Sequence, residues 1–90
     1  MGAFEVPIDG ILDLHTFNPK ELPDLLDDYI EACRQKGIYT IRIIHGKGKG
    51  IQRARVRSLL SKNEFVLGVK DAPIETGGWG ATIVAIRACI

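Results

Sequence analysis

The stretch from Ile38 to Gly50, with the sequence IYTIRIIHGKGKG, constrains the fold of this chain more than any other segment. Its first half is so rich in apolar β-forming residues that it predicts a strand buried on both faces. The strand breaks at His45 into glycines that alternate with lysines, namely Gly46, Lys47, Gly48, Lys49 and Gly50. A glycine-rich turn between a strand and a helix aims backbone N–H groups at an anion, and lysines add charges that suit phosphate. We therefore hypothesise that this turn holds the backbone of a nucleic acid.

The remaining periodicity predicts two helices and three further strands around this turn. We interpret the 90 residues as one domain spanning 1–90, with a core at about 8–88 and a short lead-in at 1–7. One helix is predicted from about 18 to 36, with Pro23 indicating either that its first turn is irregular or that the regular helix begins at this proline. A second runs from 51 to about 62, with a buried stripe of Ile51, Val56, Leu59 and Leu60. Strands are predicted at 11–14, 38–44, 65–69 and 81–88, with a loop at 71–80.

The resulting β-α-β-α-β-β order brings several polar features to one edge of the predicted sheet. A strand–helix–strand unit crosses over right-handed and makes its strands parallel, so His15 and His45 should end neighbouring strands at the same edge. If the third strand is also parallel, the loop at 71–80 returns to this edge as well. Ligands of open α/β sheets bind outside the carboxyl ends of the strands. We therefore expect the functional site at this edge.

The net charge of +1 conceals an acidic and a basic segment. Residues 21–31 carry five acids and no Lys or Arg, whereas residues 47–62 carry six bases and no acid. A one-sided basic surface is typical of nucleic-acid binding. Two solvated helix faces that pair with each other would give the same pattern, and the charges alone favour neither interpretation.

Cysteine usage and hydropathy indicate the compartment. Cys33 and Cys89 do not make the framework of a disulfide-rich secreted protein, and we expect both to be buried free thiols in a reducing compartment. No apolar run is long enough to span a membrane, and the N-terminus lacks a signal-peptide pattern. We therefore expect a cytoplasmic protein with no membrane partner.

Asp13, His15 and His45 are the candidates for catalytic chemistry. Asp13 and His15 are two residues apart on a predicted strand, so their side chains share a face. The imidazole could act as a general acid or base near neutral pH, oriented by the carboxylate. In the structural alternative, Asp13 caps a nearby backbone group and His15 only starts a loop. His45 could be a second proton carrier or a phosphate donor, or it could satisfy a backbone carbonyl.

The glycine–lysine turn matches neither common nucleotide-binding loop. It does not have the Walker A spacing, and Ile51 stands where a GxGxxG motif needs its third glycine. Its glycines could simply supply positive φ angles, but the basic helix that follows favours phosphate binding, with Arg53 and Arg57 on one outer face. Trp79 could stack on a base or pack over the sheet edge. A divalent metal could bind Asp13, His15 and His45, although their spacing matches no zinc signature.

Three blocks of the sequence resemble those of the Smr (small MutS-related) domain family. They are LDLH at 12–15, IHGKGKG at 44–50 and GGWGATIV at 77–84, in matching order and spacing over roughly residues 8–88. The resemblance implies an α/β fold, a two-layer β-α-β-α-β-β sandwich with a four-stranded mixed sheet, similar to the C-terminal domain of translation initiation factor 3. The chain is similar to the short stand-alone form of the family, so the resemblance does not imply mismatch repair.

The same resemblance implies nucleic-acid binding and, as in many members, endonuclease activity. The family's Asp-x-His motif maps onto Asp13 and His15, and its HGxG block maps onto residues 45–48, while Thr16 departs from the Gly that many members carry. We expect a monomeric endonuclease that cuts RNA or structured DNA. The sequence requires no cofactor, although a divalent metal could bind. The alternatives are a non-catalytic DNA- or RNA-binding module and a protein-interaction domain that uses the acidic helix. The expected phosphate- and nucleic-acid-binding residues are Gly46, Lys47, Gly48, Lys49, Gly50, Arg53, Arg57, Gly77, Gly78, Trp79 and Gly80.

Overall fold

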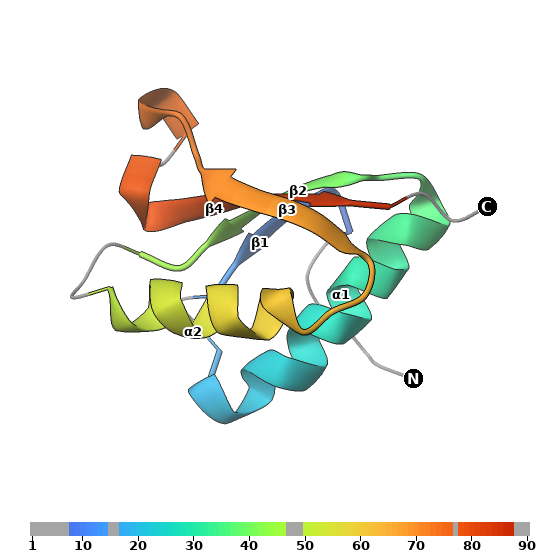
Figure 1. Cartoon of the computed structure of the whole chain (residues 1–90), viewed down its shortest axis with the longest axis horizontal. Coiled ribbons are helices and arrows are strands. Elements are labelled where there is room, and N and C mark those ends of the chain that lie inside the picture. The colour runs from blue at the N-terminus through green and yellow to red at the C-terminus, as the bar shows by residue number, and fades with distance from the viewer. Residues whose placement is uncertain (1–7, 15–16, 47–49, 77, 88–90) are drawn as a thin grey trace.

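The computed structural model describes residues 8–14, 17–46, 50–76 and 78–87 (Figure 1). Its helices and strands follow the predicted β-α-β-α-β-β order, with short 3₁₀ turns between some of them. They are β1 (Ile11–Asp13), η1 (Pro19–Glu21), α1 (Leu22–Lys36), β2 (Thr40–Ile44), α2 (Ile51–Ser61), β3 (Val66–Asp71), η2 (Ile74–Thr76), η3 (Gly78–Gly80) and β4 (Ala81–Ile86).

The four strands form one mixed sheet in the order β1-β2-β4-β3. β1 pairs parallel with β2, and β4 lies antiparallel to both of its neighbours, so β3 runs in the same direction as β1 and β2. Figure 1 shows α1 and α2 on one side of this sheet, which confirms the predicted two-layer α/β sandwich. The carboxyl ends of β1, β2 and β3 therefore meet at one edge, together with the start of α2 and the 72–80 segment.

The core lies between the sheet and the two helices. Side chains that alternate along β2 show this, because Ile41 and Ile43 are buried whereas Thr40 is exposed and Ile44 is only partly buried. The prediction that 38–44 is buried on both faces is therefore wrong, since α1 and α2 cover a single face. The rest of the core includes Leu12, Leu14, Leu22, Leu26, Tyr29, Ile30, Cys33, Val56, Leu60, Val84 and Ile86.

The N-terminus of the first helix has the irregular turn that Pro23 predicted. The Asn18 side chain accepts a hydrogen bond from Lys20 N, and the Glu21 carboxylate accepts one from Asn18 N, which together form a capping box over η1. The regular helix α1 then begins at Leu22. It ends at Gly37, whose φ of 79° is a left-handed conformation that favours glycine.

Tyr29 links α1 to the beginning of β1. Its hydroxyl oxygen accepts a hydrogen bond from Gly10 N at 3.1 Å and donates one to Ile11 O at 3.2 Å. The ring is buried, and burial raises the pKa of Tyr29 to about 12. The helix therefore fixes the position at which the first strand enters the sheet.

The second helix departs from its predicted stripe at one position. Val56 and Leu60 are buried and Leu59 packs against the core, but Ile51 is 64% exposed. Ile51 opens α2 at the rim of the sheet, beyond the strands that cover the later turns (Figure 1).

Two strand boundaries also differ from the prediction. β3 is displaced to Val66–Asp71 because its pairing with β4 extends as far as Asp71 opposite Thr82, and β4 ends at Ile86.

Cys33 is a buried free thiol, as predicted, whereas Cys89 lies outside the described residues. Within the described ranges, no helix is both long and apolar enough to cross a membrane.

Candidate functional site

The parallel pairing of β1 and β2 forms the base of the candidate site. Asp13 lies opposite Ile44, and Leu14 N donates a hydrogen bond of 2.9 Å to Ile44 O. Asp13 is therefore next to the last residue of β2, one position before His45. Asp13 and His45 therefore lie at the same edge of the sheet, as predicted, whereas His15 lies outside the described residues.

The glycine–lysine turn begins from an anchored position. The carbonyl oxygen of Gly80 accepts hydrogen bonds from His45 N at 3.1 Å and from Gly46 N at 2.9 Å. Two consecutive amides of the turn are thus tied to η3, the 3₁₀ turn that precedes β4. This contact joins two of the three sequence blocks, although Lys47, Gly48, Lys49 and Gly77 lie outside the described residues and the Trp79 side chain is not described.

The imidazole of His45 uses both nitrogens inside the fold. Nδ1 lies 3.0 Å from Gly46 O, and because a carbonyl can only accept, Nδ1 carries a hydrogen. Nε2 lies 2.8 Å from the hydroxyl of Thr82, which donates to it when the ring is neutral. Burial has the largest effect and lowers the pKa of His45; the hydrogen bond with Gly46 opposes it, and the charges of Arg53 and Arg57 lower the pKa further. The ring is therefore neutral near pH 7.

This geometry bears on the role of His45. A side chain whose two nitrogens are both engaged, one of them with a fully buried threonine hydroxyl, holds the start of the turn in place. It matches the alternative in which His45 satisfies a backbone carbonyl. Thr82 was not anticipated from the sequence, since it lies in a run of β-branched residues that gives no sign of a polar contact.

Arg53 and Arg57 share one carboxylate. The Nη2 atom of each arginine donates a hydrogen bond of 2.7 Å to Oδ1 of Asp71, so the two guanidinium groups converge on one oxygen atom. A hydrogen bond from Arg53, followed by the charges of both arginines, lowers the pKa of Asp71 below its usual range. Two cations on one anion leave a net positive charge. The predicted common face of the arginines is confirmed, and Asp71 is a member of the cluster that sequence reasoning missed.

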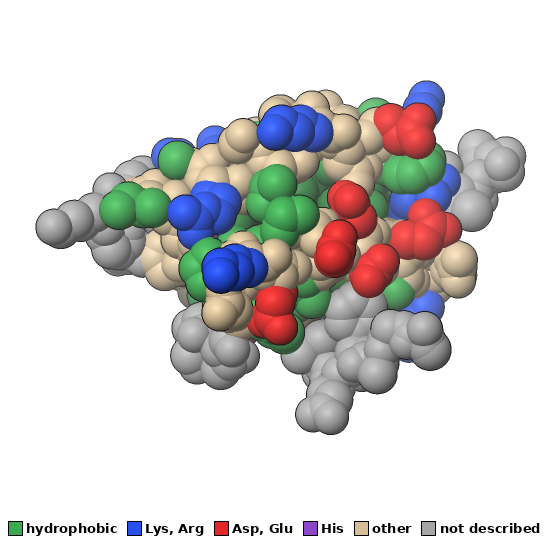
Figure 2. All heavy atoms as spheres, turned by 90° about the horizontal axis from the view of Figure 1, so that it is seen from below, with side chains coloured by type: hydrophobic (Ala, Val, Ile, Leu, Met, Phe, Trp, Pro, Cys, Tyr) green, Lys and Arg blue, Asp and Glu red, His purple; other side chains and the backbone are tan. Residues whose placement is uncertain are grey.

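The ion pairs of Arg53 and Arg57 bear on the charge pattern of the sequence, because their shared partner Asp71 belongs to β3 and not to the acidic helix α1. Figure 2, which views the helix-covered side, shows acidic side chains gathered toward α1 and basic side chains toward α2. The pair formed by Arg53 and Arg57 therefore lies at the edge where β3 ends, whereas Lys62, at the other end of the basic segment, lines a hollow with Asp27 and Glu31 of α1.

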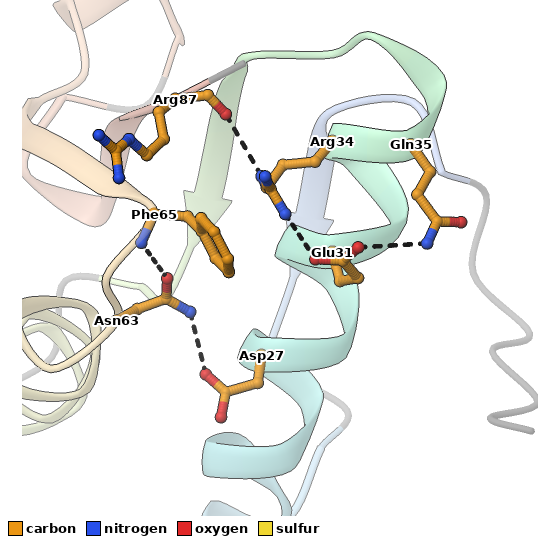
Figure 3. Close-up of polar contacts among 7 residues, drawn as sticks. All are labelled: Asp27, Glu31, Arg34, Gln35, Asn63, Phe65 and Arg87. Atoms are coloured by element: carbon orange, nitrogen blue, oxygen red, sulfur yellow. Dashed lines mark hydrogen bonds and ion pairs between the residues drawn. The ribbon is translucent and has the colours of Figure 1, made fainter. Parts of the chain in front are cut away.

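A second polar cluster ties α1 to the connection between α2 and β3 (Figure 3). Arg34 donates to Glu31 at 2.8 Å and to Arg87 O at 3.3 Å, and its guanidinium lies 3.6 Å from the centre of the Phe65 ring. Asn63 donates to Asp27 at 3.1 Å. These bonds hold the acidic side of α1 against the core and do not reach the site edge.

The start of α2 has no side-chain cap among the described residues. Gly50, with φ of 81°, precedes the helix, no side chain in the described part of the chain caps it, and the first helical bond runs from Ala54 N to Gly50 O. N–H groups of a helix's first turn attract anions, and the helix dipole adds to this attraction. Gly46 and Gly50 are thus the described residues on either side of the predicted phosphate-binding turn.

Asp13 and the arginine cluster occupy one edge but opposite faces. Leu12 and Leu14 are buried under the helices, so strand alternation directs the exposed Asp13 toward the uncovered face of the sheet. The arginines belong to α2, on the covered side. A ligand that contacts both must therefore cross the rim of the sheet.

A metal centre is not seen among the described residues, where no three His, Cys, Asp or Glu side chains are arranged to hold an ion. The set predicted from sequence includes His15 and so extends outside these ranges.

Solved structures share this fold. The crystal structure of the Smr domain of Thermus thermophilus MutS2 superposes with a TM-score of 0.78 and 36% identity, covering 86% of this chain and 96% of that one. The crystal structure of YdaL, a stand-alone small MutS-related protein from Escherichia coli, gives a TM-score of 0.75 and 29% identity, covering 90% of this chain and 66% of that one.

Sequence comparisons agree with the structures. The proteins named endonuclease MutS2 of Thermus thermophilus and of Finegoldia magna are 40% identical over 62 residues and 37% identical over 80 residues, which cover 69% and 89% of this chain. The aligned parts are only 8% and 10% of those two longer proteins. The family model described as the Smr domain matches residues 12–87. The chain therefore belongs to the Smr domain family.

Proposed function

We propose that this chain is a nucleic-acid-binding endonuclease that cuts phosphodiester bonds in RNA or structured DNA. The observation that carries the proposal is the β1–β2 register, which sets Asp13 beside the strand end that leads into the glycine–lysine turn. The relatives named endonuclease MutS2 support a nuclease over other phosphate-binding functions.

The phosphate would be held at the rim of the sheet. The open N-terminus of α2 and the glycine amides of residues 46–50 supply N–H donors, and Lys47 and Lys49 supply point charges. The net positive pair of Arg53 and Arg57 lies within the same edge. Donors fixed before the reaction stabilise the negative charge that develops on the phosphoryl oxygens in the transition state.

The proton would be moved by His15, oriented by Asp13. On RNA, the 2′-hydroxyl gives its proton to the imidazole as its oxygen bonds to phosphorus. The bond between phosphorus and the 5′-oxygen breaks, which leaves a 2′,3′-cyclic phosphate, and the 5′-oxygen takes a proton from water. The exposed position of Asp13 on the open face supports a site for this chemistry on the side of the rim away from the arginines. In this proposal, His45 keeps the turn in place and does not carry the proton, because both of its nitrogens are engaged.

A cleavage assay on labelled RNA and branched DNA, with and without chelator, tests the proposal. We expect His15→Ala to abolish cleavage while it leaves nucleic-acid affinity within about twofold, since most of the affinity for a phosphate backbone comes from the lysines and arginines. Lys36→Ala removes an exposed cation on α1 and serves as the matched surface control. Equal cleavage by wild type and His15→Ala would remove the proposed proton carrier.

A second candidate is a binding module without chemistry. The state of His45 favours a binding module, because both nitrogens of this neutral imidazole are engaged and it is the only histidine among the described residues. This candidate predicts salt-dependent binding and no product when the substrate exceeds the protein. Product formation over several turnovers would exclude it.

A further inference from the structure

The face of the sheet opposite the helices carries a row of side chains that crosses all four strands. Ile11 of β1 lies opposite Arg42 of β2, Arg42 opposite Ile83 of β4, and Ile83 opposite Lys70 of β3. Paired residues point to the same face, so two isoleucines alternate with two cations along this row. Figure 1 shows no helix on this side of the sheet other than the short turns of the 72–80 segment.

A hollow of about 440 Å³ opens over this row. Its apolar walls include Ile11, Pro73 and Ile83, and its charged walls include Arg42 and Lys70. A second hollow of about 300 Å³ continues past Lys70 and Ile83 toward β3. The two share these side chains, so they form one trough along the uncovered face.

The two cations of the trough lack the carboxylate partners that other arginines have. Arg34, Arg53 and Arg57 each form an ion pair, whereas no ion pair of Arg42 or Lys70 is found among the described residues. Buried Nε of Arg42 also has no hydrogen-bond partner within these ranges.

Asp9 is the carboxylate that lines the larger hollow, and it is already engaged. Its Oδ1 accepts a hydrogen bond from Ile11 N at 3.0 Å. With two cations and one carboxylate, the lining of this hollow carries a net positive charge. An anion with an apolar part complements such a lining better than a neutral or cationic ligand does.

We propose that this trough binds a nucleotide unit of single-stranded nucleic acid, with the base between the apolar walls and the phosphates on Arg42 and Lys70. None of the described residues lining the larger hollow is aromatic, so the base would pack against the aliphatic side chains of Ile11 and Ile83, which leaves Arg42 and Lys70 for the phosphates. The base must be free of a duplex, because the faces of a paired base are covered by the base pairs stacked above and below it. Neighbouring strands lie about 4.8 Å apart, so Arg42 and Lys70, separated by β4, start about 10 Å apart and reach over the base from two sides.

This inference rests on the proposed function and adds a path for the substrate. Asp13 lies on the same face as Ile11, two residues farther along β1. A strand seated in the trough therefore leads past Asp13 to the rim where the glycine–lysine turn begins. Single-stranded segments are accordingly the substrate class that the open face selects.

Fluorescence anisotropy with a labelled single-stranded oligonucleotide tests the trough. Lys70 is exposed, so Lys70→Gln should fold normally and lose one phosphate contact. For a single strand this reduces the salt slope by about 0.7 and the affinity by about fivefold at 0.1 M salt. Arg42→Gln should act in the same direction, whereas Lys36→Ala, on the helix side, should leave affinity unchanged. Equal affinity of Lys70→Gln, Arg42→Gln and Lys36→Ala for the single strand would overturn the proposal, as would a wild-type chain that binds only duplex.

A second arm separates this proposal from the nuclease proposal. The His15→Ala variant should still bind the single strand and still respond to Lys70→Gln, whatever its cleavage activity. Amide shifts of Thr40, Arg42 and Ile83 on titration with a short single strand would support the trough directly. Shifts confined to the start of α2 would overturn it while leaving phosphate binding at the rim intact.

Discussion

Tyr29→Phe removes a single oxygen atom that holds the beginning of the first strand. The hydroxyl accepts from Gly10 N and donates to Ile11 O, and the ring is only 1% exposed. A buried N–H left without a partner costs about 1–3 kcal/mol, and the lost bond to Ile11 O costs about 1 kcal/mol more. We therefore expect the free energy of unfolding to fall by about 2–4 kcal/mol.

This loss is large for a chain of 90 residues. Its total stability should be roughly 5–13 kcal/mol, and each kcal/mol shifts the midpoint of thermal unfolding by about 4–8 °C. Tyr29→Phe should therefore lower the melting temperature by roughly 10 °C or more. Tyr39, the other tyrosine, is 38% exposed and provides the matched control. Tyr39→Phe should change the free energy of unfolding by less than about 0.5 kcal/mol.

Denaturant unfolding of both variants, repeated from pH 8 to 12, completes the experiment. The pKa of Tyr29 is raised from 10.0 to about 12 in the folded chain, so only the unfolded chain loses this proton between those values. Stability from this group is full below pH 10 and falls as the pH rises toward 12. The decline in this window should be shallower in Tyr29→Phe. If Tyr29→Phe costs no more than Tyr39→Phe, the hydroxyl does not anchor the strand and the reasoning fails.

Other perturbations test the helix ends, the core and the turn. Burial lowers the pKa of His45, so the unfolded chain binds a proton first; unfolding free energy should fall as the pH drops below about 6.5, and His45→Asn should weaken this dependence in denaturant titrations. Leu60→Ala should cost about 2–4 kcal/mol because the side chain is fully buried, whereas Leu67→Ala, at a 67% exposed position, should cost under about 1 kcal/mol by calorimetry. Gly37→Ala should destabilise the chain by about 1 kcal/mol, since φ is 79°, whereas Gly68→Ala meets no atom within 4 Å and should be nearly neutral. Equal effects within either pair would contradict the burial or backbone argument behind it.

The part of the fold that follows from connectivity could be predicted from the sequence. Two strands joined by a helix must lie parallel, and this alone brought Asp13 to the end of β2 beside His45. Pro23 also marked the irregular start of α1 correctly, because a proline ring fits only the first turn of a helix.

The parts that failed depend on which neighbours cover a residue. The apolar run around β2 predicts burial on both faces, yet Arg42 and Thr40 alternate with Ile41 and Ile43 and mark an open face. The pairing of Asp71 with Arg53 and Arg57 could not be predicted, because β3 approaches α2 only through the register of a sheet that the sequence does not specify.

The shared carboxylate of Asp71 has a consequence for the lifetime of any complex at the rim. Both guanidinium groups are partly neutralised before a ligand arrives, so an incoming phosphate must share them with a resident anion. A phosphate that must share both arginines with Asp71 should stay bound for a shorter time than one that meets free cations. Such a rim suits repeated rounds of capture and release better than long retention of one strand.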